Sequence, residues 1–569
     1  MPIDRNYLNR RATALKNERS TFEPLYKDVD QYILPGSTEF NTSENNQGQR
    51  KNQKIINDTA TDAAGTLSSG FMGGLTSPAK VWFQVRTNSP AKNKLKAARI
   101  WLDTVTKNMA DVFLRSNIYQ VLPQAYLDLG GHATTAFAVL EDDEAVIRAY
   151  HFPVGSYWLG TSHRGVVDTF YREFPMTARQ IVQRFGLKNC TEAVKSASER
   201  NEDAWFDVAH FVEPNPDHDD KKAGSEFKAF RSIYWELASS EGTLSEKGFD
   251  QFPIIAPRWS VRGSGIYGNQ CPGFQCIGDV KMLQVGERRG WEALDKMVKP
   301  PLQAPSSLKN RPIEGIPNGV TYVDVTQGQQ GVKPLYEVNV PLERLDARLA
   351  RVEYRIRRAF HADLFLMISG MDQQAQPVTA AEINARREEK MLMLGPVLER
   401  LNDEGFDPLI KITFSIMLNR SMPLWGTERE SEALIPPPPQ EIQGAAGLVI
   451  EYVSVLAQAQ KLIGTAALEK MVYFLANLMK LYPEAADKAD FDEMIDEYAE
   501  MVGAGPKTIR EAKEVAGIRA QRQQAAQAQN ALAMAQAGAK TAQTLGTTPM
   551  NPDTALGAML GRQFGMPQQ

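Results

Sequence analysis

Hydrophobic residues recur at helical spacing through most of the first 115 residues. Residues 4–34 and 92–115 each place apolar side chains along one face, which predicts two amphipathic helices, the first kinked at Pro24. A further helix, rich in small residues, is expected to begin after Asn57-Asp58 and to end near Gly73-Gly74. The N-terminal part of the chain is therefore predicted to be helical.

The hydrophobic period changes from helical to strand-like between residues 130 and 262. Apolar runs of strand length are separated there by turn signals such as Asp142-Asp143 and His163-Arg164-Gly165. Thr177 and Gln180 have the spacing of a capping box, which predicts a short helix that ends at Gly186. The predicted strands are 81–85, 135–140, 145–152, 156–159, 166–174, 205–212, 229–237 and 253–261. We expect a mostly antiparallel α+β region.

The most regular helical pattern covers residues 342–368. A helix is also predicted over 274–299, and the insert between the two, 300–341, holds seven prolines and cannot be helical. The apolar positions of 342–368 are spaced 3, 4, 3 and 4 residues apart, as in a coiled-coil seam: Leu342, Leu345, Leu349, Val352 and Ile356. A parallel stripe of arginines follows the same rhythm: Arg344, Arg348, Arg351, Arg355 and Arg358.

Two interpretations of this helix are open. A charged stripe is usually a solvated face. Alternatively, the helix packs between like helices of neighbouring subunits, with the seam as the contact and the arginines facing acids of the next subunit. The long seam and the segregation of charge together favour the second interpretation.

The rest of the chain is predicted to be helical, with polar and proline-rich interruptions. Residues 369–378 form a polar loop, and Thr379 and Glu382 supply a capping box for the helix that follows. Pro436 to Pro439 predict a stiff linker. Helices are expected near 456–481, 488–501 and 506–543, and residues 544–569 are expected to be disordered. Alanine and glutamine make up 17 of the 25 residues in 519–543, so that helix has little apolar face of its own.

Composition excludes several classes of protein. The chain has 569 residues, enough for three or four domains, and a net charge of −4, which argues against a protein that grips nucleic acid through its phosphates. Its three cysteines are too few for a disulfide framework. We expect no membrane span, because no run of eighteen apolar residues occurs, and no signal peptide at the polar N-terminus.

Local motifs for catalysis are weak. Gly263, Gly265 and Gly268 form a GxGxxG pattern, but Pro272-Gly273 would interrupt the helix that a dinucleotide site requires, so a tight loop is favoured. Cys271 and Cys276 have no partner pair at zinc spacing, and the six histidines form no local cluster. We therefore predict no cofactor and no metal site, and the hypothesis of an enzyme is weak, although a catalytic triad assembled in space stays open.

Several separate motifs stand along residues 5–460. They are Phe22-Glu23-Pro24-Leu25-Tyr26 with Tyr32-Ile33-Leu34-Pro35, Ser69 to Ala79 with Trp82-Phe83, Tyr171-Arg172-Glu173-Phe174 with Met176 to Gln180, Arg258-Trp259 with Tyr267-Gly268, Thr379 to Ile383, and Leu394-Gly395-Pro396-Val397. In their order and spacing, these motifs resemble those of podovirus portal proteins, the head-to-tail connector family, and the resemblance covers most of residues 5–460.

This resemblance implies a portal fold and a ring, usually of twelve subunits, at one vertex of the capsid. The fold would combine a mainly α-helical stem and crown with a β-containing wing and a small clip. The implied division is 1–262 as wing and body, 263–299 as the first stem helix with its preceding loop, 300–341 as the clip, 342–368 as the second stem helix, 369–378 as the tunnel loop, 379–440 as a kinked wing helix and linker, 441–505 as crown helices, and 506–569 as a C-terminal helix that could build a barrel, with a disordered tail.

The resemblance also implies how such a ring is used. DNA would pass through the channel without sequence specificity, touching the tunnel-loop residues Ser369, Gly370, Met371, Asp372, Gln373, Gln374 and Gln376. The implied partners are the major capsid and scaffolding proteins, the large subunit of the terminase and a tail adaptor. The protein would reside in the virion after assembly in the bacterial cytoplasm. Two alternatives stay open: a helical scaffolding or adaptor protein that forms no ring, and a nucleotide-binding enzyme that uses the 263–268 loop.

Overall fold

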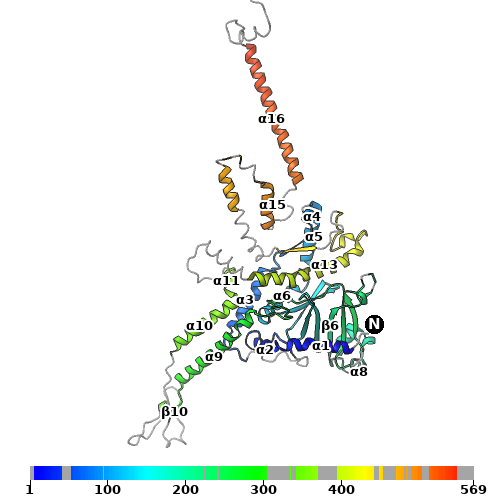
Figure 1. The fold of residues 1–569 in the computed structure, drawn as a ribbon, viewed down its shortest axis with the longest axis vertical. Coiled ribbons are helices and arrows are strands. Elements are labelled where there is room, and N and C mark those ends of the chain that lie inside the picture. Colours follow the sequence, from blue (N-terminus) through cyan, green and yellow to red (C-terminus); the bar gives the residue numbers. More distant parts are fainter. Residues whose placement is uncertain are drawn as a thin grey trace, which may run out of the picture. The chain divides into compact units, whose positions relative to one another are not determined.

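A computed structural model gives the fold of the chain. It describes residues 5–40, 53–93, 95–219, 221–222, 224–239, 242–303, 333–334, 341–368, 394–440, 448–452, 469–479, 482, 484, 489–502 and 512–547. The chain forms two compact units, Met1–Ala467 and Leu468–Gln569. The described part mixes helices with antiparallel sheets, which confirms the predicted α+β class (Figure 1).

The first unit begins with helices. They are α1 (Arg5–Ser20), α2 (Glu23–Tyr32), α3 (Thr59–Gly74), α4 (Pro90–Asn93), α5 (Lys96–Arg115) and α6 (Ile118–His132). The predicted helix 4–34 is thus two helices, because the chain turns at residues 21–22, just before Pro24. The sequence did not predict α6, which contains Pro123 and has Gly130 and Gly131 in its last turn. Its apolar face is buried against the other helices, and this burial outweighs the cost of the proline.

The β-rich region holds two antiparallel sheets. One has the strand order β3-β2-β9 and the other β4-β5-β6-β7-β8. The strands are β2 (Ala136–Asp142), β3 (Val146–Phe152), β4 (Tyr157–Thr161), β5 (Val167–Thr177), β6 (Trp205–Pro214), β7 (Phe230–Glu236), β8 (Ser245–Phe249) and β9 (Ile254–Ile255). All the strands predicted for this region are confirmed in position, although β9 is much shorter than 253–261, and β8 was not predicted.

Two short helices follow the long strand β5. They are α7 (Ala178–Phe185) and α8 (Glu192–Arg200). The predicted capping box is present: the Gln180 backbone N–H donates to Thr177 Oγ1 at 3.3 Å, and the Thr177 N–H donates to Gln180 Oε1 at 3.0 Å. As predicted, α7 ends at Gly186, whose φ of 79° favours glycine.

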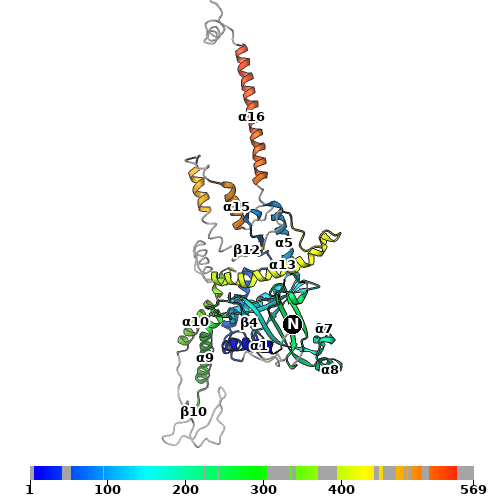
Figure 2. The same cartoon turned by 45° about the vertical axis from the view of Figure 1, so that its right-hand side comes forward.

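A pair of long helices, α9 (Pro272–Val298) and α10 (Leu342–Ala359), runs side by side (Figures 1 and 2). Between them, β10 (Leu302–Gln303) pairs with β11 (Lys333–Pro334) at the base of the proline-rich insert. The predicted helix 342–368 is in fact broken. The helix α10 ends at Ala359, and α11 (Ala362–Ile368) begins after His361, whose φ of 54° is left-handed.

The last part of the first unit is a helix with an irregular turn. Residues 394–401 are α-helical, residues Asn402–Phe406 form a π-helical turn, and α13 (Asp407–Ser421) continues. The strand β12 (Leu448–Tyr452), which was not predicted, pairs antiparallel with β1 (Phe83–Thr87). The short 3-10 helices of this unit are η1 (Leu187–Asn189), η2 (Ser225–Phe227), η5 (Met422–Leu424) and η6 (Glu430–Glu432).

The described part of the second unit is mainly helical. It contains a helix at 469–479, α15 (Phe491–Val502) and α16 (Ala512–Thr547). Arg519 of α16 donates two hydrogen bonds to the carboxylate of Asp492, at 2.6 and 2.7 Å. Because α16 extends to Thr547, the disorder expected from residue 544 is wrong for its first four residues.

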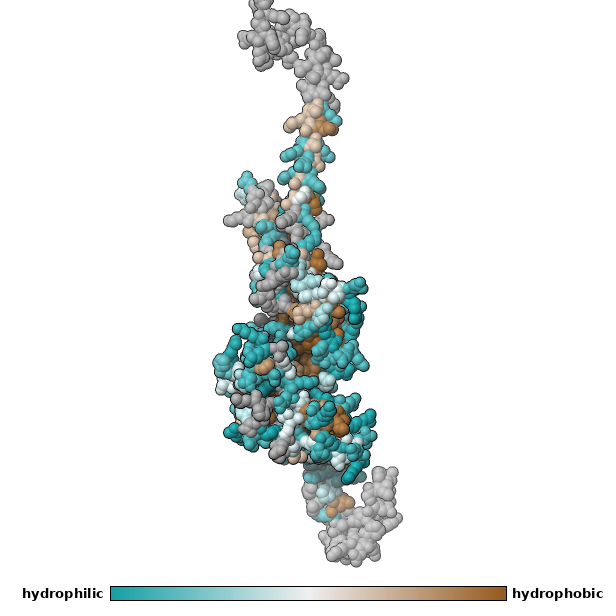
Figure 3. Space-filling view, turned by 90° about the vertical axis from the view of Figure 1, so that its right-hand side faces the viewer, coloured by the Kyte–Doolittle hydropathy of each residue, from teal (hydrophilic) through white to brown (hydrophobic). Residues whose placement is uncertain are grey.

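The largest hydrophobic core lies where the helices of the first unit meet. It gathers buried side chains from α3, α5, α6, α9, α10, α11 and α13. One face of the molecule is mainly hydrophilic, with a few hydrophobic areas between the hydrophilic ones (Figure 3). Among the described helices, none has the length and hydrophobicity needed to cross a membrane.

Candidate functional site

The helix pair α9 and α10 approaches closely along its outer part. Gly286 and Gly290 of α9 face Leu349 and Leu345 of α10. A Cβ at Gly286 would lie 2.6 Å from Leu349 Cδ2, and one at Gly290 would lie 3.2 Å from Leu345 Cδ2. The two glycines thus leave space for the leucines, and the helices can pack directly against each other.

The inner part of the predicted seam is buried within the same chain. Val352 and Ile356 are only 6% and 0% exposed, and they share the large core with Val280 and Leu283 of α9. The seam therefore packs against α9 of its own subunit. A role of the seam in contacts between subunits stays a prediction.

A polar clamp holds both helices to the segment before α3. The Asn57 side-chain amide donates to Glu287 Oε1 of α9 at 3.0 Å and to Glu353 Oε1 of α10 at 2.8 Å. The buried Gln284 side chain accepts from the backbone N–H groups of Ile56 and Asn57 and donates to the Asn57 carbonyl. One short segment thereby fixes the relative positions of α9 and α10.

The predicted arginine stripe is solvent-exposed along α10. Arg355 makes a bidentate ion pair with Asp279 of α9, at 2.7 and 3.0 Å. Arg344, Arg348 and Arg351 are exposed. Among the described residues, Asp279 is the one acid that pairs with an arginine of this stripe, and it belongs to the same chain. The expected pairing with acids of a neighbouring subunit stays a prediction.

The pair also leaves large apolar side chains uncovered. Met282, Val285 and Trp291 of α9 and Tyr354 of α10 are 50%, 49%, 61% and 62% exposed. An isolated subunit thus presents apolar surface on helices that are otherwise well packed.

The two loops with predicted roles lie largely or wholly outside the described residues. All the predicted tunnel-loop residues lie outside the described residues: Ser369, Gly370, Met371, Asp372, Gln373, Gln374 and Gln376. The predicted capping box of Thr379 and Glu382 lies outside them too. Of the insert 300–341, the described residues are 300–303, 333–334 and 341.

The helix that leads toward residue 369 is anchored by a glycine of α3. A Cβ on Gly70 would lie 2.2 Å from the ring of Phe365 in α11, and this ring also meets Phe71 edge-on, with 5.7 Å between centroids. Gly70 belongs to the motif Ser69 to Ala79. The glycine of this motif is therefore explained by packing, because α11 can lie against α3 only where no side chain stands at residue 70.

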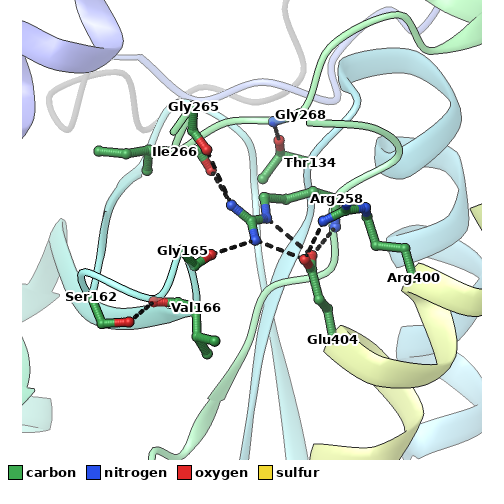
Figure 4. A network of polar contacts seen from close by, with 10 residues as sticks. All are labelled: Thr134, Ser162, Gly165, Val166, Arg258, Gly265, Ile266, Gly268, Arg400 and Glu404. Atoms are coloured by element: carbon green, nitrogen blue, oxygen red, sulfur yellow. Dashed lines mark hydrogen bonds and ion pairs between the residues drawn. The ribbon is translucent and has the colours of Figure 1, made fainter. Parts of the chain in front are cut away.

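The glycine pattern before α9 is a tight loop held by one arginine (Figure 4). The Arg258 side chain, 3% exposed, donates to the carbonyls of Gly265 and Ile266 at 3.3 and 3.2 Å and to that of Gly165 at 2.9 Å. The Gly268 N–H donates to Thr134 Oγ1 at 2.8 Å. A Cβ on Gly268 would lie 1.9 Å from the Ala133 carbonyl oxygen, so only glycine fits.

The same arginine joins this loop to the π-helical turn. Arg258 donates to both carboxylate oxygens of Glu404, at 2.7 and 3.0 Å, and Arg400 donates to Glu404 at 2.7 Å. The backbone groups of the loop are thus engaged with the protein, and α9 begins only at Pro272. This geometry is that of the tight loop favoured from the sequence.

The cysteines beside this loop are buried. Burial raises the pKa of the Cys276 thiol to about 12 and that of Cys271 still further, so both stay protonated at neutral pH. Cys271 instead caps α9, its sulfur accepting from the Phe274 N–H at 3.4 Å. Within the part of the chain that the structure describes, no cluster of His, Cys, Asp or Glu could hold a metal ion.

Sequence reasoning missed the residues that position these helices. The sequence indicates Asn57 only as the start of a helix, and it gives no signal for Gln284 or Glu404. Each carries one polar group toward a partner far away in the sequence, and a single sequence gives no signal for such a pair. The motif containing Arg258 was the only available indication.

Comparisons with known proteins cover almost the whole chain. The sequence model of a family described as bacteriophage head to tail connecting protein matches residues 5–509. The portal protein of Salmonella phage epsilon15 is 44% identical over 568 residues, which is 100% of this chain and 99% of the relative. A probable portal protein of Bordetella phage BPP-1 is 38% identical over 556 residues, 97% of each chain.

Proposed function

The chain belongs to the bacteriophage head-to-tail connecting protein family and functions as a portal for genome packaging and ejection, and we propose that it does so as a closed ring of twelve identical subunits. The family is structural, and portal proteins are components of the virion capsid. The stoichiometry and the assignment of parts to the ring are proposals.

Exposed apolar side chains are the observation that supports a ring. In the second unit, Met471, Val472, Tyr473 and Phe474 of the helix 469–479 are all exposed, between 43% and 76%. Four consecutive helical residues point in four directions around the axis, so exposed apolar side chains lie on several sides of this helix. A helix of that kind is stable only when neighbours cover it. Identical subunits would supply that cover here and at Met282, Val285 and Tyr354.

The helices α9 and α10 are proposed to be the stem. Two packed helices with a polar clamp at one end make a stiff element, and the exposed stripe of Arg344, Arg348 and Arg351 would face acids of the next subunit. The insert 300–341 would be the clip that docks the terminase and later the tail adaptor. Residues 1–262 and 379–440 would form the wing, 441–505 the crown, and the long α16 a possible barrel.

The segment 369–378 is proposed to line the channel. It carries three glutamines and neither Lys nor Arg. Glutamine can make exchangeable hydrogen bonds to phosphate and sugar without the counterion release that gives tight binding. DNA of any sequence would slide past such a loop. The capsid and scaffolding proteins would surround the ring.

Native mass spectrometry tests the ring. The wild-type chain should give one closed assembly near twelve subunits over a broad concentration range. Val285→Glu should weaken it, because a charge would be buried between subunits. Val166→Glu changes an equally exposed valine, on the β4–β5 turn, and should leave the assembly intact. A monomer or a small open assembly of the wild type would overturn the proposed closed ring.

A further inference from the structure

A row of side chains crosses the five-stranded sheet through its middle. Arg172 of β5 lies opposite His210 of β6, which lies opposite Tyr234 of β7. The His210 and Tyr234 rings stack in parallel, with 3.8 Å between their centroids. Arg184 of α7 reaches the same place and donates to Tyr234 Oη at 3.0 Å.

No described carboxylate compensates the positive charges of the two arginines, of which Arg172 is partly buried and Arg184 is exposed. Neither Arg172 nor Arg184 forms an ion pair with a carboxylate of the described residues. The Arg172 guanidinium lies instead over the rings of Phe152 and Phe174, at 4.6 and 3.9 Å from their centroids. Aromatic rings on its faces hold the guanidinium in place and remove water from it, which strengthens its attraction for an anion.

Two buried polar atoms at this place also have no hydrogen-bond partner among the described residues: the Arg172 Nε donor and His210 Nδ1, which donates or accepts according to the tautomer of the ring. His210 is 5% exposed, and its Nε2 is already engaged with Ser232 Oγ at 3.0 Å. Burial, together with Arg172 and Arg184, holds the pKa of His210 well below its usual range, so this ring adds no charge. Buried polar groups are nearly always satisfied by protein groups, waters or ions, so these two atoms are candidates for contact with a bound water or ion.

We propose that Arg172, Arg184 and Tyr234 form a binding site for one oxoanion group. The arginines supply two positive charges and forked donors that match the oxygens of a carboxylate or a phosphate. Tyr234 Oη accepts from Arg184 and therefore keeps its own hydrogen for the ligand. The group could be a free phosphate ion or an acidic side chain of a partner protein. The site uses no residue of α9 or α10, so the inference is independent of the ring.

Thermal unfolding of the full-length protein in phosphate tests the site. Sodium phosphate should raise the unfolding midpoint of the wild type above its value in sodium chloride of equal ionic strength, because a ligand that binds only the folded state stabilises it. Phosphate also stabilises folded proteins in general, because it is excluded from their surface. Arg172→Gln and Arg184→Gln should each reduce the difference to that general effect. Arg179→Gln removes an exposed arginine from the same helix α7 and should keep the full difference. A difference that is absent in the wild type, or equal in all four proteins, would overturn the proposal.

Addition of a short polyglutamate peptide distinguishes the two sources of the ligand. If the peptide raises the wild-type midpoint at a lower concentration of anionic groups than phosphate does, the natural ligand is an acidic protein segment. If phosphate acts and the peptide does not, it is a free ion. Both results support the site, provided that Arg184→Gln removes the site-specific part of the rise in the unfolding midpoint.

Discussion

The carboxylate of Glu404 accepts two hydrogen bonds from the Arg258 side chain, at 2.7 and 3.0 Å, and so joins a π-helical turn to the loop that precedes α9. Arg258 is almost fully buried, and Glu404 is the acid that balances its charge. The stability of this junction therefore depends on both partners.

Glu404→Ala should lower the free energy of unfolding by about 3–5 kcal/mol, the usual cost of leaving one charge of a buried pair without its partner. Chemical denaturation measures this. Glu432→Ala, which breaks an exposed pair with Arg429, is the control and should cause no measurable change. Equal effects of the two variants would contradict a structural role for the buried pair.

Gly70→Ala should destabilise the protein by about 1–3 kcal/mol, because the new methyl group would overlap the Phe365 ring in a packed core. Gly73→Ala is a matched control in the same helix, where a Cβ meets nothing within 4 Å. That change should be neutral or stabilise by up to about 1 kcal/mol, through helix propensity. Thermal unfolding of both variants gives the comparison, and the opposite order would show that α11 does not dock on Gly70.

Asn57→Asp should destabilise the protein more than Asn57→Ala at neutral pH, since it places a third carboxylate against Glu287 and Glu353. Two unit charges about 4 Å apart repel by about 1 kcal/mol even in water, which sets the scale of the difference. Urea unfolding at pH 7 and near pH 4 measures it. The difference in the free energy of unfolding between Asn57→Asp and Asn57→Ala should become smaller at the lower pH, because the carboxylates are protonated there. A difference that does not depend on pH would refute the clamp.

Burial of the Cys276 thiol predicts a loss of stability in alkali. The pKa of the folded thiol is raised to about 12, whereas an unfolded thiol ionises near about 8.5. Above about pH 8.5 the unfolded state loses a proton that the folded state keeps, so stability falls as pH rises. The stability of the wild type relative to Cys276→Ala should drop by about 1 kcal/mol between pH 7 and pH 9.5 in urea unfolding. A constant difference would mean that the thiol is not shielded from water.

Removal of Asp372–Gln376 tests the proposed channel loop. Rings and procapsids should assemble normally, because these residues belong neither to α10 nor to the wing. Filling should stop early, or packaged DNA should be retained poorly, as measured by the length of DNA per particle. Particles that package and hold a full genome would show that the loop has no role in the channel.

Local patterns in the sequence determined much of this fold. The spacing of Thr177 and Gln180 predicted a capping box that is present, and the alternating runs between 130 and 262 predicted most strands of the two sheets. The leucine spacing predicted α10, and the prolines of 300–341 separated it from α9. These signals can be recognised in a single sequence because they depend on backbone preferences and on neighbours within a few residues.

Tertiary packing decided what local patterns could not. α6 forms in spite of Pro123 because its apolar face is buried, and the helix 342–368 breaks at His361, where no glycine or proline marks the break. β12 joins β1 across most of the first unit, and Arg258 meets Glu404 146 residues away. A buried charge or an edge strand needs some partner, but only the folded chain determines which distant residue is close enough to serve.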